Sequence, residues 1–218
     1  MAVAQPQGFL ALPVNKQGGS VLVLHAWWGL NDTIKNFCKR LAEAGFIAFA
    51  PDLYHGKTAK TIPEAQALSG ALENDADHAR AEVTDAAGFL IERSGQHASG
   101  LAVIGFSLGA YFALELSLRN PDDIHSVVVF YGTCPGDYGE AKAAYLGHFA
   151  EHDDYEPQRN VVSLEGELKQ VGRPVSFYIY PGTGHWFFEP DRPDSFNKAA
   201  ADLAWQRTLA FLKRNPGS

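Results

Sequence analysis

The sequence predicts one α/β domain, spanning residues 1–218, with a mostly parallel central sheet and helices on both of its faces. Short runs rich in valine, isoleucine and aromatic residues are almost entirely apolar, as strands buried on both faces of a parallel sheet are. Segments with helical spacing of apolar residues lie between them, so strand and helix alternate along the chain. The length of 218 residues and the 46% hydrophobic content fit a single core of this kind.

The strands of this sheet are predicted from the apolar runs, taken in chain order. They are residues 21–26, 47–52, 101–107, 126–132, 145–151 and 175–182.

The helices are predicted in the segments between these runs and after the last of them. They are residues 32–45, 75–94, 108–119, 158–169 and 195–214. The first is the clearest, because Ile34, Phe37 and Leu41 share one face and Gly45 ends it. In the last, Ser195 is the expected N-cap, and the basic residues of the final turn suit the helix dipole.

Charge, cysteine content and the N-terminal segment limit the partners and the location. The formal net charge of −7 disfavours nucleic acid or an anionic membrane surface as a partner. Cys38 and Cys134 are too few for a disulfide framework, so both thiols are expected to be free. The N-terminal segment lacks the basic region of a secretory signal, and no apolar run is long enough to cross a bilayer. We expect a cytoplasmic protein, and the sequence indicates no oligomeric state.

The stretch VIGFSLGAYFAL, residues 103–114, carries one serine, Ser107, between Gly105 and Gly109. It runs from a predicted central strand into a predicted helix, which is the setting of a nucleophile elbow. A Cβ at either glycine would clash at so tight a turn, and the serine hydroxyl is left exposed. The backbone N–H of Leu108, at the start of the helix, is placed to stabilise an oxyanion. A glycine turn with an incidental serine is the competing interpretation.

A serine hydroxyl needs a histidine to accept its proton and a carboxylate to orient that histidine. Of the histidines after Ser107, only His185 lies in a loop just beyond a strand, in YIYPGTGHWFF, so it is the predicted base. The acid is predicted in HDDYEP, where position alone does not separate Asp153 from Asp154. Pro157 suits a turn that leads into a helix and favours Asp153.

The segment HAWWGL, after the first predicted strand, is the expected source of a second oxyanion donor, the backbone N–H of Trp27. The side chains of Trp27 and Trp28 are expected either to pack in the core or to cover the site. His148 and His152 are four residues apart, but they lie on a strand and at its end, so no metal site is inferred. A glycine-rich phosphate loop is also missing, and no cofactor is expected.

Six segments, in this order, make the chain resemble the dienelactone hydrolase family of the α/β-hydrolase superfamily over nearly its whole length. They are VLVLHAWWGLND, LAEAGFIAFAPDLYHGK, GLAVIGFSLGAYFAL, VVVFYG, EHDDYEP and YPGTGHWFF. The resemblance implies an α/β-hydrolase fold, with Ser107 as nucleophile, His185 as base and Asp153 as the catalytic aspartate. It also implies a variable loop after APDLY.

The chain departs from the family pattern at several positions. Dienelactone hydrolases proper have cysteine in place of Ser107 and glutamate in place of Ala26. They also have two arginines that bind the substrate carboxylate. One would fall at Glu189, and the other has no clear counterpart in residues 60–74. The resemblance therefore implies a serine esterase that prefers neutral, compact esters, because a glutamate would repel a substrate carboxylate. The expected pocket walls are Trp28, Cys134, Trp186, Phe187 and Glu189.

Together these residues predict a carboxylic ester hydrolase that cleaves an ester or a lactone through an acyl-enzyme on Ser107. Two alternatives remain open. One is a thioesterase that uses the same triad, and the other is a non-catalytic hydrolase-fold protein that binds a small ligand. In each case the expected partner is a small molecule.

Overall fold

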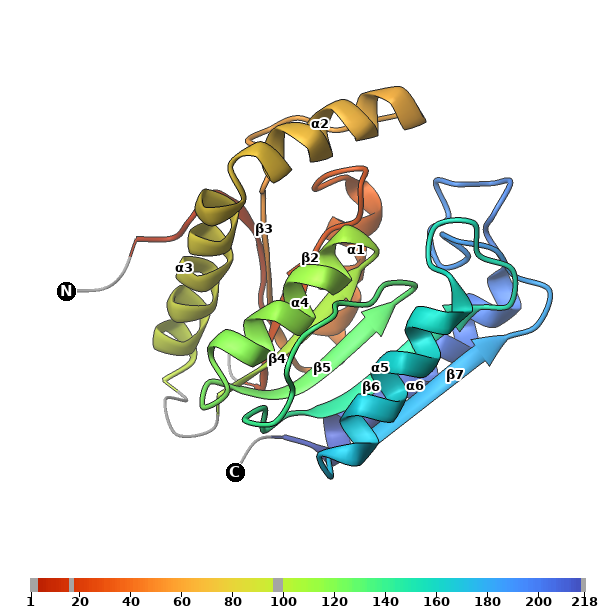
Figure 1. Ribbon diagram of the computed structural model, residues 1–218. Coiled ribbons are helices and arrows are strands. Elements are labelled where there is room, and N and C mark those ends of the chain that lie inside the picture. Colours follow the sequence, from red (N-terminus) through yellow and green to blue (C-terminus); the bar gives the residue numbers. More distant parts are fainter. Residues whose placement is uncertain (1–3, 16–17, 96–99, 217–218) are drawn as a thin grey trace.

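The centre of the fold is a single, mostly parallel β-sheet (Figure 1). The computed structural model describes residues 4–15, 18–95 and 100–216. Within these ranges seven strands follow the order β1-β3-β2-β4-β5-β6-β7, and all neighbours are parallel except β1, which is antiparallel to β3. Their bounds are β1 Gly8–Ala11, β2 Ser20–Leu24, β3 Ile47–Pro51, β4 Leu101–Phe106, β5 Ile124–Phe130, β6 Ala144–Ala150 and β7 Val175–Tyr180. This sheet confirms the predicted α/β class.

The burial of the strands explains why their sequences lack alternation. Every residue of β2, β3, β4 and β6 is buried, so both faces of these strands need apolar side chains. The two edge strands, β1 and β7, are partly exposed along their length, as expected for the edges of the sheet.

The helices cover both faces of the sheet. Their bounds are α1 Asp32–Glu43, α2 Ile62–Asn74, α3 Ala76–Ser94, α4 Leu108–Arg119, α5 Gln158–Gln170 and α6 Lys198–Arg214. Phe37 of α1 and Phe211 of α6 belong to the apolar cluster on one face. Val83 of α3, Phe112 of α4 and Leu164 of α5 belong to the cluster on the other, and these three helices lie in front of the sheet in Figure 1. Among the described residues, no helix combines the length and the hydropathy that a bilayer span requires.

Two elements are absent from the sequence prediction. Strand β1 is only four residues long and pairs along the edge of the sheet with β3, so its apolar pattern is too short to stand out. Helix α2 occupies the segment for which the resemblance implies a variable loop. A capping box starts it, in which the Thr61 side chain accepts from the backbone N–H of Glu64 and the Glu64 carboxylate accepts from that of Thr61.

The last helix begins later than predicted. Its N-cap is Asn197 rather than Ser195, because the Asn197 side chain accepts a hydrogen bond from the backbone N–H of Ala200, 3.1 Å away. The first turn of α6 therefore starts at Lys198.

The sheet gathers the predicted site residues at one edge. Parallel strands end at the same edge, and β4 lies between β2 and β5 near the middle of the sheet. The loop after β2 carries Trp27, the turn after β4 carries Ser107, and the loops after β6 and β7 carry Asp153 and His185. Figure 1 shows the loops after β6 and β7 side by side beyond the arrowheads of these strands, and a hydrogen bond from the His152 backbone N–H to the Thr183 carbonyl joins them.

Candidate active site

The turn that carries Ser107 joins β4 to α4 in a strained conformation. Its backbone has φ 50° and ψ −111°, a region that residues with a side chain rarely adopt. The neighbouring strand holds the turn, because the Ser107 N–H donates to the Phe130 carbonyl at 2.9 Å. A Cβ on Gly105 would lie 2.2 Å from the Gly109 carbonyl oxygen, and one on Gly109 would lie 2.2 Å from the Leu24 carbonyl oxygen. Only glycine fits at either place, as the tight turn predicts.

A chain of hydrogen bonds links the serine to a carboxylate. Ser107 Oγ lies 2.9 Å from His185 Nε2, and His185 Nδ1 lies 2.8 Å from each carboxylate oxygen of Asp153. The side chains of His185 and Asp153 are only 4% and 6% exposed. Because a carboxylate only accepts, Nδ1 carries the ring proton and Nε2 is free to accept the serine proton. This is the geometry required of a nucleophile, a base and an orienting acid.

Asp153, rather than Asp154, faces the histidine. The Asp153 Oδ1 atom also accepts the backbone N–H groups of Tyr155 and Glu156, at 2.9 and 2.8 Å, which fixes the carboxylate against the turn. Asp154 is exposed. The geometry thus distinguishes Asp153 from Asp154, which position in the sequence alone does not.

A cavity of about 190 Å³ lies beside the serine and the histidine. Trp27 and Leu108, the predicted sources of oxyanion donors, both line it. Leu108 opens helix α4, and the first N–H groups of a helix have no partner within it. The Trp186 ring, predicted as a wall, also lines the cavity and packs on Tyr155 with ring centroids 4.7 Å apart.

Two predicted pocket residues are core residues instead. Trp28 is 2% exposed, lies edge-on to Trp186 and has the Arg192 guanidinium 3.7 Å above its ring. Phe187 is fully buried between Tyr131 and Tyr180. The prediction that their side chains line the pocket is wrong, because the backbone turns both of them toward the apolar cluster that also holds α1 and α6.

Cys134 also lies away from the serine. It lines a separate cavity of about 160 Å³ with Leu164 and Glu167 of α5. Burial raises the pKa of its thiol to about 12, so the nucleophilic thiolate is scarce at neutral pH. The expectation that Cys134 lines the catalytic pocket is therefore corrected.

Glu189 lies behind the cavity wall, not on it. Its side chain is fully buried, and the Tyr131 hydroxyl donates to its Oε1 at 2.7 Å. Burial raises the pKa of this carboxyl to about 8, so it is mostly neutral at pH 7. Tyr131 does line the cavity, with its ring centroid 4.8 Å from that of His185. Glu189 therefore lies outside the cavity lining and carries little negative charge at pH 7.

Five cavity residues escaped the sequence prediction: Tyr131, Gly132, Thr133, Tyr155 and Glu156. Each was within reach of a local signal, because the first three directly follow strand β5 and the other two lie two and three residues after Asp153. Glu156 is the carboxylate on the wall. Its Oε2 accepts from both the backbone N–H and the hydroxyl of Thr133, at 2.7 and 3.0 Å.

Comparison with known proteins agrees with this fold. A model of the dienelactone hydrolase family matches residues 7–215. Protein usf of Aquifex pyrophilus is 32% identical, over 95% of this chain and 92% of its own. An Aquifex aeolicus protein provisionally named carboxymethylenebutenolidase is 27% identical, over 95% of this chain and 92% of its own. The structure of the dienelactone hydrolase-like promiscuous phosphotriesterase P91, from metagenomic libraries, has a TM-score of 0.81 at 21% identity and covers 91% of this chain and 87% of its own.

The fold and these matches define a hydrolase with the α/β-hydrolase architecture. The family model spans nearly every residue from the first strand to the end of the last helix. The chain belongs to the dienelactone hydrolase family.

Proposed function

We propose that the protein is a serine esterase that cleaves a neutral carboxylic ester or lactone through an acyl-enzyme on Ser107. One observation carries the proposal, the hydrogen-bonded chain from Ser107 Oγ through the His185 ring to Asp153. Its three side chains come from the ends of three different strands, and they meet at the mouth of a cavity. Such a set is the machinery of acyl transfer.

In the first half-reaction the serine oxygen attacks the substrate carbonyl carbon while its proton passes to His185 Nε2. Asp153 keeps the ring in the correct tautomer and stabilises the positive charge that develops on it. The backbone N–H groups of Leu108 and Trp27 stabilise the negative charge on the tetrahedral carbonyl oxygen. The carbon–oxygen bond to the leaving group then breaks, and His185 returns the proton to the departing alcohol.

In the second half-reaction water takes the place of the alcohol. His185 accepts a proton from the water as its oxygen attacks the acyl-enzyme carbonyl. Collapse of the second tetrahedral species breaks the bond to Ser107, which recovers its proton from His185. The products are a free carboxylic acid and the unchanged enzyme. With a lactone substrate the acid and the alcohol leave as one molecule.

The cavity favours an uncharged and compact acyl group. Its volume of about 190 Å³ is small, and aromatic rings from Trp27, Tyr155 and Trp186 line it. None of its described lining residues is a lysine or an arginine that could hold a substrate carboxylate. The carboxylate of Glu156 on the wall would instead repel one.

We also propose a cytoplasmic location for the protein. Its support is the state of the two cysteines, Cys38 and Cys134, which are both free and buried. A reducing compartment is where such thiols persist.

The test is hydrolysis of small p-nitrophenyl esters by wild type, Ser107→Ala and His185→Ala. Each variant should lose about 10³-fold or more in kcat, because the remaining catalysis comes from the oxyanion hole alone. Ser163→Ala, which changes an exposed serine on α5, is the matched control and should retain full activity. Near-wild-type turnover by Ser107→Ala or His185→Ala would refute the proposal.

Two outcomes of the same assay would favour the alternative functions. Faster turnover of a thioester than of its matched oxygen ester would indicate a thioesterase with the same triad. Reversible binding of esters without turnover would indicate a non-catalytic protein.

A further inference from the structure

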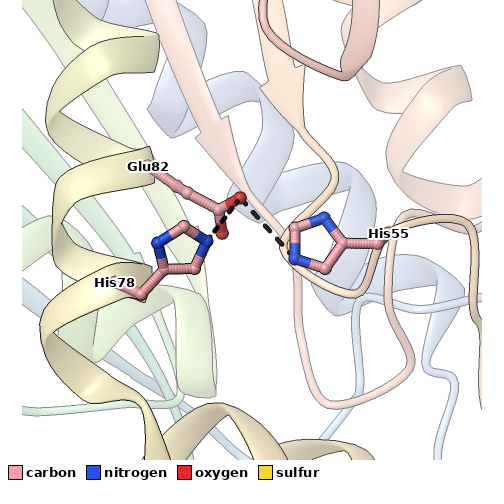
Figure 2. Close-up of side chains that lie close together, drawn as sticks. All are labelled: His55, His78 and Glu82. Atoms are coloured by element: carbon pink, nitrogen blue, oxygen red, sulfur yellow. Dashed lines mark ion pairs between the residues drawn. The ribbon is translucent and has the colours of Figure 1, made fainter.

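A second cluster of side chains with metal-ligating atoms lies outside the active site. His55 belongs to the loop after β3, while His78 and Glu82 are one helical turn apart near the start of α3. Figure 2 shows both imidazole rings turned toward the Glu82 carboxylate from opposite sides. None of these three residues lines the cavity beside Ser107.

The separations within this cluster suit a tetrahedral metal ion. The Nε2 atoms of His55 and His78 each lie 3.6 Å from the same oxygen of Glu82, and all three ligand atoms lie within 4.8 Å of one another. Zinc bonds of about 2.0–2.2 Å at tetrahedral angles put ligand atoms about 3.4 Å apart. The two short separations already match this value to within a few tenths of an ångström. The third separation, between the ligand nitrogens of His55 and His78, needs only a small rotation of these two exposed imidazoles to match as well.

Helix α3 and the loop after β3 hold these ligands in place. Positions four apart on a helix share one face, which brings His78 and Glu82 together on α3. His55 is held in a left-handed conformation, with φ 51°, that a residue with a side chain adopts only when its surroundings impose it. The Asp52 carboxylate imposes it, because it accepts the backbone N–H groups of Tyr54 and Gly56 at 3.2 and 2.7 Å on either side of His55.

Charge and access also favour a cation. The side chains of His55, His78 and Glu82 are 54%, 59% and 27% exposed, so an ion can enter and keep a water ligand. An adjoining groove is lined by His78, Glu82 and further carboxylates, those of Asp52, Asp85 and Glu92, with no lysine or arginine among its described lining residues. The potential in this groove is therefore negative and attracts cations.

We propose that His55, His78 and Glu82 form a zinc-binding site, with water as the fourth ligand. Two imidazoles and one carboxylate are a donor set that zinc accepts, and the ion adds no step to the serine mechanism. Its effect is structural. The bound ion joins the loop after β3 to helix α3 beside the end of α2, whose Leu72 lines the same hollow as His55 and His78. Zinc bound to the folded state alone stabilises that state.

The test is titration of Zn²⁺ into the full-length, chelator-treated protein. Calorimetry measures both the binding during the titration and the thermal unfolding of the zinc-bound protein. Wild type should bind one ion per chain, and its Tm should rise by roughly 5–10 °C at a free Zn²⁺ concentration 100 times the Kd. Co²⁺ in place of zinc should give the intense visible absorption of a tetrahedral site.

Single variants decide whether these residues are the ligands. His55→Ala, His78→Ala and Glu82→Gln should each weaken binding by about 100-fold or more and abolish the Co²⁺ band, since even loss of a residue that only supports a ligand costs 10–100-fold. His152→Ala is the matched control, because it removes another exposed histidine that pairs with a neighbouring glutamate, Glu151, at 3.4 Å. This control should bind zinc as wild type does.

Two results would overturn the proposal. One is the absence of saturable binding to wild-type protein that is shown to be folded by circular dichroism. The other is equal zinc affinity in wild type and all three ligand variants, which would mean adventitious binding to surface histidines only. Both readouts are independent of ester hydrolysis, so this proposal can fail while the proposed function stands.

Discussion

Replacement of Glu189 by glutamine should change how stability depends on pH. Glu189 is fully buried, and its Oε1 accepts the Tyr131 hydroxyl hydrogen bond. Burial raises the pKa of this carboxyl from its ordinary value of 4.5 to about 8. Glutamine has nearly the shape of the neutral acid and keeps a carbonyl oxygen to accept from Tyr131, but it never ionises.

The sign and the size follow from proton linkage. Because the folded state holds the Glu189 proton more tightly than the unfolded state does, wild type loses stability as the pH rises from about 4.5 to about 8. The loss is about 1.4 kcal/mol per pH unit, and on the order of 4–5 kcal/mol across the whole interval. Glu189→Gln escapes this loss. The free energy of unfolding of the variant, relative to wild type, should therefore increase steadily from pH 5 to pH 8.

The assay is urea unfolding of both proteins at pH 5, 6, 7 and 8, with the free energy of unfolding extrapolated to water. Glu140→Gln, which neutralises an exposed carboxylate, is the control and should run parallel to wild type. A constant difference between Glu189→Gln and wild type across this range would refute the reasoning, because it would mean that Glu189 ionises in the folded state as readily as in the unfolded state.

Three further predictions concern activity. Asp153→Asn should lower kcat by about 10³–10⁴-fold, because the wrong histidine tautomer is then favoured. Asp154→Asn should have only a mild effect on kcat. The reverse result would mean that Asp154, not Asp153, is the catalytic acid. Cys134→Ala should keep most activity, since its thiol lines a separate cavity, and loss of the acyl-enzyme in this variant while Ser107→Ala stays active would contradict this. Glu156→Gln should raise kcat/KM for a carboxylate-bearing ester about fivefold relative to a matched neutral ester, because like charges some 6–8 Å apart repel by about 1 kcal/mol across a partly solvated cavity. An unchanged ratio would show that this charge does not reach the substrate.

The sequence predicted those parts of the molecule that local patterns specify. The fully buried strands are nearly continuous apolar runs, and the turn at Ser107 requires glycine on both sides, so the central sheet and the elbow were visible. His185 could be selected because, among the later histidines, it alone lay in a loop just beyond a strand. Helix α2 was missed although Thr61 and Glu64 carry a capping-box signal, because its apolar face is weakly patterned.

Side-chain direction within loops was the part that the sequence could not specify. Three side chains show this, because they are neighbours of site residues along the chain yet point into the core: Trp28, Phe187 and Glu189. The backbone dihedral angles at a single loop position decide whether its side chain enters a cavity or the core. The cluster around Glu82 was hidden for a different reason. His55 lies far from His78 along the chain, and only the packing of the loop after β3 against α3 brings their rings together.

The central claim is that Ser107 is the nucleophile of an acyl-enzyme, and mass spectrometry of the protein treated with a fluorophosphonate tests it most directly. Wild type should gain one phosphonyl group per chain, with the mass increase on the peptide that contains Ser107. Ser107→Ala should gain none, and His185→Ala should react far more slowly because its serine has no base. A stable fold without any adduct, or an adduct that persists in Ser107→Ala, would contradict the account.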